Sequence, residues 1–151
     1  MMTRLVHVLL AISALTTIGC SDDEGSSGTS ATTVNLALRE FAIAATPNTV
    51  KAGAVKFVAT NTGEDVHEVV FVKTDLAIAQ LPKNTDGTFN EDGQGVAVID
   101  EIEDVDPGKS VEKTLTLAAG HHVLVCNVVQ QEDAGQESHF HEGMLTDLTV
   151  Q

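Results

Sequence analysis

The chain contains neither tryptophan nor tyrosine, and phenylalanine occurs only 5 times among its 151 residues. Any hydrophobic core must therefore come mainly from valine, leucine, isoleucine and alanine. Hydrophobic residues still make up 42% of the sequence, which excludes a disordered acidic tail because such tails have too little apolar surface to bury. A chain of this length predicts one domain.

Lysine and arginine are also scarce. The sequence has 8 basic side chains against 22 acidic ones, which gives a formal net charge of −14. This charge disfavours nucleic acid and anionic membrane surfaces as partners, because their phosphate groups would repel the protein. It favours a partner protein with a basic docking face, since long-range attraction speeds such an encounter.

The N-terminal segment has the features of an export signal. Arg4 precedes an apolar run, Leu5–Leu15, which is too short to span a bilayer. Residues 1–19 therefore predict a secretory signal peptide. Cys20 follows the residues "TIG", which resemble the bacterial lipobox, where the chain is cut before the cysteine and its thiol is lipidated. Ordinary secretion with a nearby cleavage site is the alternative.

Residues 20–33 follow with serine, glycine, threonine and acidic residues, and they predict a flexible tether. We expect an exported, membrane-anchored lipoprotein that faces the periplasm or the cell exterior and touches the membrane only through its lipid. Lipidation of Cys20 would leave Cys126 with no disulfide partner in the chain. An unpaired thiol is unusual in an oxidising compartment unless it is used or protected.

From residue 34 onward, short runs rich in valine, leucine, threonine and phenylalanine alternate with turn signals. This pattern predicts an all-β fold over residues 34–151, a Greek-key β-sandwich of about seven or eight strands. Residues 75–81, which end at Pro82, predict a short helical turn. The expected strands cover residues 34–45, 54–61, 67–74, 96–105, 110–120, 121–127 and 144–151.

Two polar residues stand in register with apolar neighbours on these strands. His67 begins the run "HEVVFV", and Cys126 ends the run "HHVLVC". Each shares a face with every second residue of its strand, because successive side chains of a strand point to opposite sides. The beginning of one antiparallel strand and the end of another can lie at the same pole of a sandwich. This arrangement permits His67 and Cys126 to meet.

His139 and Met144 follow Cys126 before the last expected strand. Two imidazoles and one thiolate, with a weak axial thioether, are the donor set of a blue-copper site. The set His67, Cys126, His139 and Met144 therefore predicts one bound copper ion. The alternatives are a buried inert thiol at Cys126, a strand-end histidine at His67 and a core methionine at Met144.

Three motifs resemble the cupredoxin family, the small blue-copper proteins such as plastocyanin and azurin. The segment "NTGEDVHEVVF" is similar to the loop and strand that deliver the first histidine. The segment "AAGHHVLVCN" is similar to the family's Gly-x-Tyr-x-x-x-Cys strand, with Gly120 and Cys126 in place. The segment "HFHEGMLTDLTV" matches the His-x4-Met run before the last strand, with His139 and Met144 in place. The resemblance implies a cupredoxin fold, a copper cofactor and these ligands.

The sequence departs from the family pattern at several positions. His122 stands where the family has a tyrosine, and Glu68 stands where many members have an asparagine that braces the site. The insert 127–138 between Cys126 and the next histidine is much longer than usual, although a longer loop costs little closure entropy. His141 is an alternative ligand to His139, which is favoured because it keeps the family's spacing to Met144.

The expected function is that of a one-electron carrier between redox partners outside the cytoplasm, and the protein is expected to act as a monomer. An enzyme is not expected, because the fourth ligand leaves no open metal position for a substrate. Copper storage, delivery or sensing without electron transfer is the second hypothesis. A metal-free interaction domain with Cys126 merely buried is the third.

Overall fold

The computed structural model describes residues 31–132 and 135–151, and this part of the chain consists almost entirely of β-strands. One 3₁₀ turn, η1 (Ile78–Gln80), lies at the helical turn expected for residues 75–81. The strands are β1 (Thr32–Arg39), β2 (Ala42–Thr46), β3 (Thr49–Val50), β4 (Gly53–Asn61), β5 (His67–Thr74), β6 (Val96–Val105), β7 (Ser110–Leu117), β8 (Gly120–Val125), β9 (Val129–Glu132), β10 (Gly135–Ser138) and β11 (Leu145–Val150).

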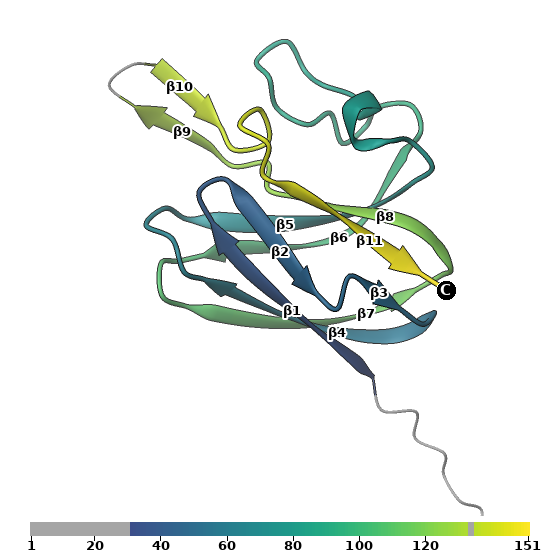
Figure 1. Cartoon of the computed structure of the whole chain (residues 1–151). Helices are drawn as coiled ribbons and strands as arrows, with labels where there is room; N and C mark the ends of the chain where they lie inside the picture. Colours follow the sequence, from purple (N-terminus) through teal and green to yellow (C-terminus); the bar gives the residue numbers. More distant parts are fainter. Residues whose placement is uncertain (1–30, 133–134) are drawn as a thin grey trace, which may run out of the picture.

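The strands form two facing sheets and a separate hairpin (Figure 1). One sheet has the order β2-β1-β4-β7, and the other has the order β3-β11-β8-β5-β6. β9 and β10 pair only with each other and project beyond the sandwich. The expected all-β sandwich is therefore confirmed, with more strands in the described residues than the seven or eight expected from the sequence.

Side-chain alternation builds the core between the two sheets. In the second half of β1, every second residue is buried and those between are exposed. β5 differs because it is buried on both faces: Val69 and Phe71 join the core between the sheets, while Val70 and Val72 belong to a second cluster. The side chains that complete this second cluster include Leu81, Phe89 and Phe140. The long β5–β6 connection therefore helps to cover the outer face of the five-stranded sheet.

The structure differs from the expected elements in several places. The run 34–45 is not one strand but two, β1 and β2, which turn back at Glu40 and Phe41. β1 begins at Thr32, two residues before the expected domain boundary. The insert 127–138 contains the hairpin β9–β10, which the sequence pattern did not predict.

The expected signal peptide, the start of the tether and the lipidation site Cys20 lie outside the described residues. Within residues 31–132 and 135–151, no helix has the length and apolar character needed to cross a membrane.

Candidate metal centre

The sandwich brings His67, Cys126 and His139 together at one pole. His67 is the first residue of β5, Cys126 directly follows β8, and His139 directly follows β10. β5 and β8 are antiparallel neighbours with Val70 opposite Val125, so the start of one lies beside the end of the other. All three side chains are 0% exposed. The expectation that His67 and Cys126 share a pole is confirmed.

The three residues point their donor atoms at one another. The two Nδ1 atoms of His67 and His139 lie 3.2 Å apart. Cys126 Sγ lies 3.4 Å from Nδ1 of His139 and 3.9 Å from Nδ1 of His67. Donors that share one ion through bonds of about 2.0–2.3 Å lie roughly 3–4 Å apart, so these positions fit a single metal ion. Among the described residues, these three form the one group of His, Cys, Asp or Glu side chains whose donor atoms lie close enough together to hold a metal ion.

Met144 lies next to this group and is also 0% exposed. Its backbone N–H donates to the carbonyl of His139 at 2.9 Å, and its own carbonyl accepts from the N–H of Cys126 at 3.0 Å. Met144 and Cys126 also belong to the same hydrophobic core cluster. The backbone therefore fixes Met144 between two members of the group.

Burial keeps the three donors uncharged when no ion is bound. It raises the pKa of the Cys126 thiol to about 11, and it lowers the pKa of both His67 and His139. A neutral imidazole has one bare nitrogen, which can bind a cation. The thiol must lose its proton to the cation that binds, so metal binding and proton release are coupled here.

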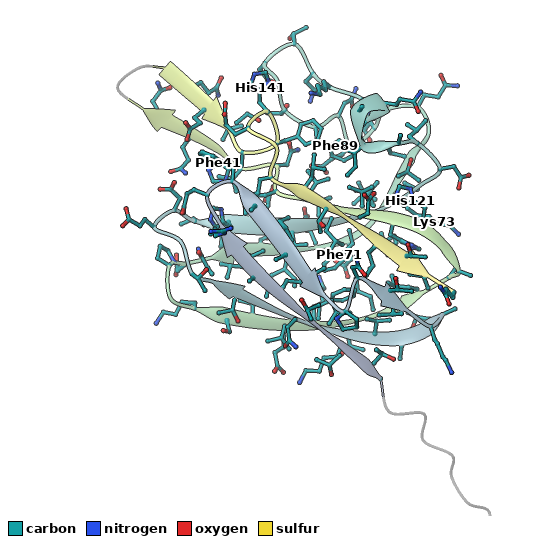
Figure 2. All side chains as sticks on the ribbon, in the orientation of Figure 1. Phe41, Phe71, Lys73, Phe89, His121 and His141 are labelled. Atoms are coloured by element: carbon teal, nitrogen blue, oxygen red, sulfur yellow. The ribbon has the colours of Figure 1, made fainter. Side chains whose placement is uncertain are left out.

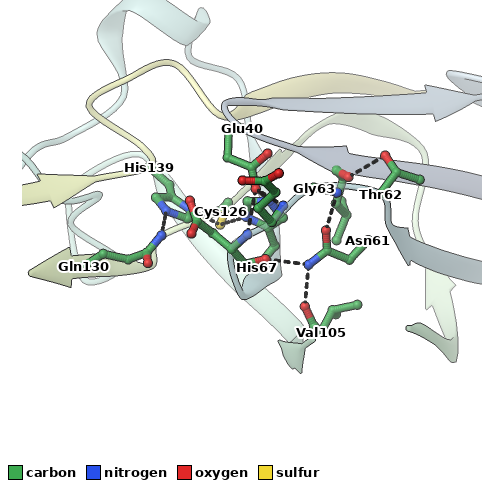
Figure 3. A network of polar contacts seen from close by, with 12 residues as sticks. Glu40, Asn61, Thr62, Gly63, His67, Val105, Cys126, Gln130 and His139 are labelled. Carbon is green, nitrogen blue, oxygen red and sulfur yellow. Dashed lines mark hydrogen bonds and ion pairs between the residues drawn. The ribbon is translucent and has the colours of Figure 1, made fainter. Parts of the chain in front are cut away.

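Glu40, at the turn between β1 and β2, lies behind His67 (Figure 3). Its Oε1 lies 3.2 Å from Nε2 of His67, which is close enough for an ion pair. The two groups are not aligned well enough for a full hydrogen bond. The same oxygen accepts the backbone N–H groups of Glu64 and Asp65, each at 2.8 Å. Partial burial opposes ionisation, but these amides outweigh it and lower the pKa of Glu40 to about 2. Glu40 is therefore an anion beside the imidazole.

A buried asparagine shapes the loop that leads to His67. Asn61 is 1% exposed, and its Nδ2 donates to the carbonyls of Asp65 at 2.6 Å and of Val105 at 2.8 Å. Its Oδ1 accepts the N–H of Gly63 at 2.8 Å. One side chain therefore fixes the loop to itself and to the end of β6. The resemblance pointed to this loop as the one before the first histidine, but not to the role of Asn61.

The hairpin in the insert covers the other imidazole. The side-chain amide of Gln130, on β9, lies 2.7 Å from Nε2 of His139, and Phe41 stands edge-on to the same ring with centroids 5.1 Å apart. The amide donates to a bare Nε2, and it can present its oxygen when Nε2 carries a proton. His139 consequently has no exposed edge.

Glu68 occupies the position where the resemblance implies a bracing asparagine. Its Oε1 accepts the backbone N–H of Asn127 at 2.9 Å, which ties β5 to the residue after Cys126. Burial raises the pKa of Glu68. The bracing contact is thus made here by a carboxyl group.

The other histidines within residues 31–132 and 135–151 lie outside the group. His141 is exposed and lies against Gly87 rather than among the donors, and Figure 2 labels it on the connection after β10. His122 is buried, as expected for a residue in the tyrosine position, with Nδ1 3.3 Å from the carbonyl of Gly120. His121 is partly exposed and pairs with Asp147 at 2.7 Å.

No family model and no curated protein matches this chain. Solved structures do. A reduced auracyanin from Roseiflexus castenholzii is 24% identical with a TM-score of 0.54, over 80% of this chain and 98% of its own. Auracyanin A from Chloroflexus aurantiacus, described as a "blue" copper protein, is 21% identical with a TM-score of 0.55, over 81% of this chain and 100% of its own.

Rusticyanin from Thiobacillus ferrooxidans is 15% identical with a TM-score of 0.52, over 81% of this chain and 79% of its own. At these identities the likeness establishes the fold, a cupredoxin-like β-sandwich. The resemblance expected from the sequence is confirmed at this level.

Proposed function

We propose that this chain is a type 1 copper protein that carries single electrons between redox partners outside the cytoplasm. The observation that carries the proposal is the buried group of His67, Cys126 and His139, whose donor atoms all lie within 4.8 Å of one another. The fold supports it, because auracyanin A, which has the same fold, is described as a blue copper protein.

The donor set suits copper in both of its common oxidation states. His67 and His139 would supply imidazole nitrogen, Cys126 the thiolate and Met144 the weak axial sulfur. Copper bound there supplies a one-electron couple. The protein contributes a set of ligands held in place by backbone bonds and shielded from water, so little has to move when the charge of the site changes. With four ligands filling the site, no position remains for a substrate, which favours electron transfer over catalysis.

The proposed setting of this function comes from the sequence. Residues 1–19 would direct export, and a lipid on Cys20 would anchor the domain through a tether. The net charge of −14 favours a redox partner with a basic docking face and disfavours nucleic acid. The protein is proposed to act as a monomer.

Copper storage or delivery is the second candidate, and one observation favours it. All three donor residues and Met144 are 0% exposed, and the hairpin covers the outer nitrogen of His139. A sealed site of this kind suits a protein that retains copper as well as one that exchanges electrons. The two functions differ in how readily the bound ion changes oxidation state.

One experiment separates the candidates. Cu(II) is added to the purified protein, and visible absorption and cyclic voltammetry are recorded for the wild type, Cys126→Ser and His141→Ala. A carrier gives a strong thiolate-to-copper band and reversible cycling, both of which survive in His141→Ala and vanish in Cys126→Ser. Stoichiometric copper uptake without reversible cycling supports storage. If the wild type takes up no copper, both the electron-transfer function and the storage function are refuted.

A further inference from the structure

The two imidazoles of the candidate site have different partners on their outer nitrogens. Nε2 of His67 faces the Glu40 carboxylate at 3.2 Å, and Nε2 of His139 faces the neutral amide of Gln130 at 2.7 Å. Both rings turn Nδ1 toward Cys126. The outer nitrogen of His67 therefore faces a negative charge, and the outer nitrogen of His139 faces a neutral amide dipole.

The Glu40 carboxylate rests in a pocket that the backbone provides. The N–H groups of Glu64 and Asp65 both donate to Oε1 at 2.8 Å, an arrangement that favours a negative oxygen. A Cβ at Gly63 would overlap the Glu40 carboxylate, so any larger residue there would displace this carboxylate. These contacts hold the charge in one place rather than leaving it on a mobile surface side chain.

The loop that forms this pocket is itself tied to β1. The backbone N–H and the hydroxyl of Thr62 both donate to the carbonyl of Leu38, at 2.9 Å and 3.1 Å. Leu38 lies two residues before Glu40, so the loop and the carboxylate are fixed to the same strand end. The distance from Glu40 to His67 is thereby set by the fold.

We propose that Glu40 is a positioning residue that selects the Nε2–H form of His67 and lowers the reduction potential of the bound copper. This inference rests on the proposed copper function. A carboxylate behind a ligating imidazole fixes its tautomer and makes it a stronger donor. The carboxylate also favours the more highly charged Cu(II) over Cu(I), because its negative charge is close and partly shielded from water.

The first test is Glu40→Gln, which removes the charge but keeps an oxygen that can accept the same two backbone N–H groups. We expect Cu(II) affinity to fall about tenfold relative to Cu(I) affinity, measured by competition with chelators of each ion. For a one-electron couple this ratio equals a rise in reduction potential of about 59 mV. Glu64→Gln is the matched control, because it removes an exposed charge from the same loop.

A second variant tests the same idea in the opposite direction. Gln130→Glu places a carboxylate behind His139, and the reduction potential should fall. An unchanged potential in Glu40→Gln, or a change no larger than that in Glu64→Gln, overturns the role of Glu40 in setting the potential.

A copper-free measurement keeps the two proposals distinguishable. Imidazole ¹⁵N–¹H NMR of the apoprotein should show His67 as the Nε2–H tautomer in the wild type and a mixture of tautomers in Glu40→Ala. A wild type without a thiolate band refutes the electron-carrier function alone, and the NMR result still decides whether Glu40 positions His67. An unchanged tautomer in Glu40→Ala refutes the positioning role.

Discussion

At the scale of single residues, buried polar side chains stabilise the pole that carries the donors, because they form hydrogen bonds with the backbone groups around them. Asn61 is the central case, because it serves three backbone groups from one 1% exposed position. Two of these groups, on Gly63 and Asp65, lie in the loop before His67, and the third is the carbonyl of Val105 at the end of β6. Together with the hydrogen bonds from Thr62 to Leu38, this side chain holds in place a loop that is not itself part of a strand.

Asn61→Ala should therefore destabilise the protein strongly. The variant leaves two carbonyls and one N–H without this partner at buried or partly buried positions, and we expect the free energy of unfolding of the apoprotein to fall by about 2–4 kcal/mol. Chemical denaturation measures it. Asn35→Ala, at an exposed position of β1, is the control and should change stability by less than about 0.5 kcal/mol. A loss for Asn61→Ala as small as that of the control would show that water replaces the lost contacts.

The donors themselves were predictable from the sequence, and their partners were not. His67 and Cys126 stand out because residue type and strand register both point to one pole, and His139 stands out through the spacing to Met144 that the resemblance implies. Glu40 gives no such signal, because it lies in a run of strand-forming residues without glycine or proline to mark the turn. Its role depends on where the β1–β2 turn falls in space. That position follows from packing between sheets rather than from local pattern.

At the scale of elements, the insert between Cys126 and His139 behaves as a lid built from two strands. β9 and β10 pair in register from Val129 with Ser138 to Glu132 with Gly135, and β9 places Gln130 on His139. The sequence "QQEDAGQES" has too few apolar residues to show the alternation that predicts a strand, which explains why the hairpin was missed. The two strands pair with each other, and Gln130 adds a polar contact to His139.

Gln130→Ala should loosen the lid over His139. The variant removes the contact that holds the imidazole from outside, and contacts of this kind typically change metal affinity by a factor of about 10–100. We expect release of copper from the loaded protein to a Cu(I) chelator to become about tenfold faster. Gln136→Ala, at an exposed position on β10, is the control. Equal release rates in the two variants contradict a role for Gln130 in retaining the ion.

β6 contributes an irregularity that no periodic pattern reveals. His67 pairs with Val105 and Val69 pairs with Ile102, so Glu103 and Asp104 together oppose a single residue of β5. Asp104 adopts a φ of 49° at this bulge. A bulge changes the local twist and the direction of nearby side chains, and this one lies directly beside His67. The direction of the His67 side chain thus depends on β6 as well as on β5.

At the scale of the whole molecule, several acidic side chains lie at the pole of the candidate site. The end of β6 that pairs with His67 carries exposed Glu103 and Asp104. The loop before His67 carries exposed Glu64, and Glu40 lies behind the ring. With a net charge of −14 over the chain, this pole should attract cations and repel anions.

The sign of this field can be measured with small redox reagents. We expect the reduced copper protein to be oxidised by a cobalt(III) tris-phenanthroline cation at a rate that falls with added salt, and by hexacyanoferrate(III) at a rate that rises. Between about 10 and 300 mM salt, the ratio of the two rate constants should change by at least about tenfold, because screening removes both the attraction and the repulsion. Stopped-flow absorption at the thiolate band gives both rates.

Two charge-reversing substitutions show where on the molecule the negative charge attracts the cationic reagent. Glu103→Lys lies at the pole of the candidate site, whereas Asp75→Lys lies just beyond the far end of β5 and produces the same change in net charge. If electrons leave near His67 and His139, Glu103→Lys should slow the cationic reagent more than Asp75→Lys does at low salt. Equal effects would mean that only the total charge matters. A larger effect of Asp75→Lys would place the exit for electrons at the opposite pole, away from the buried donors.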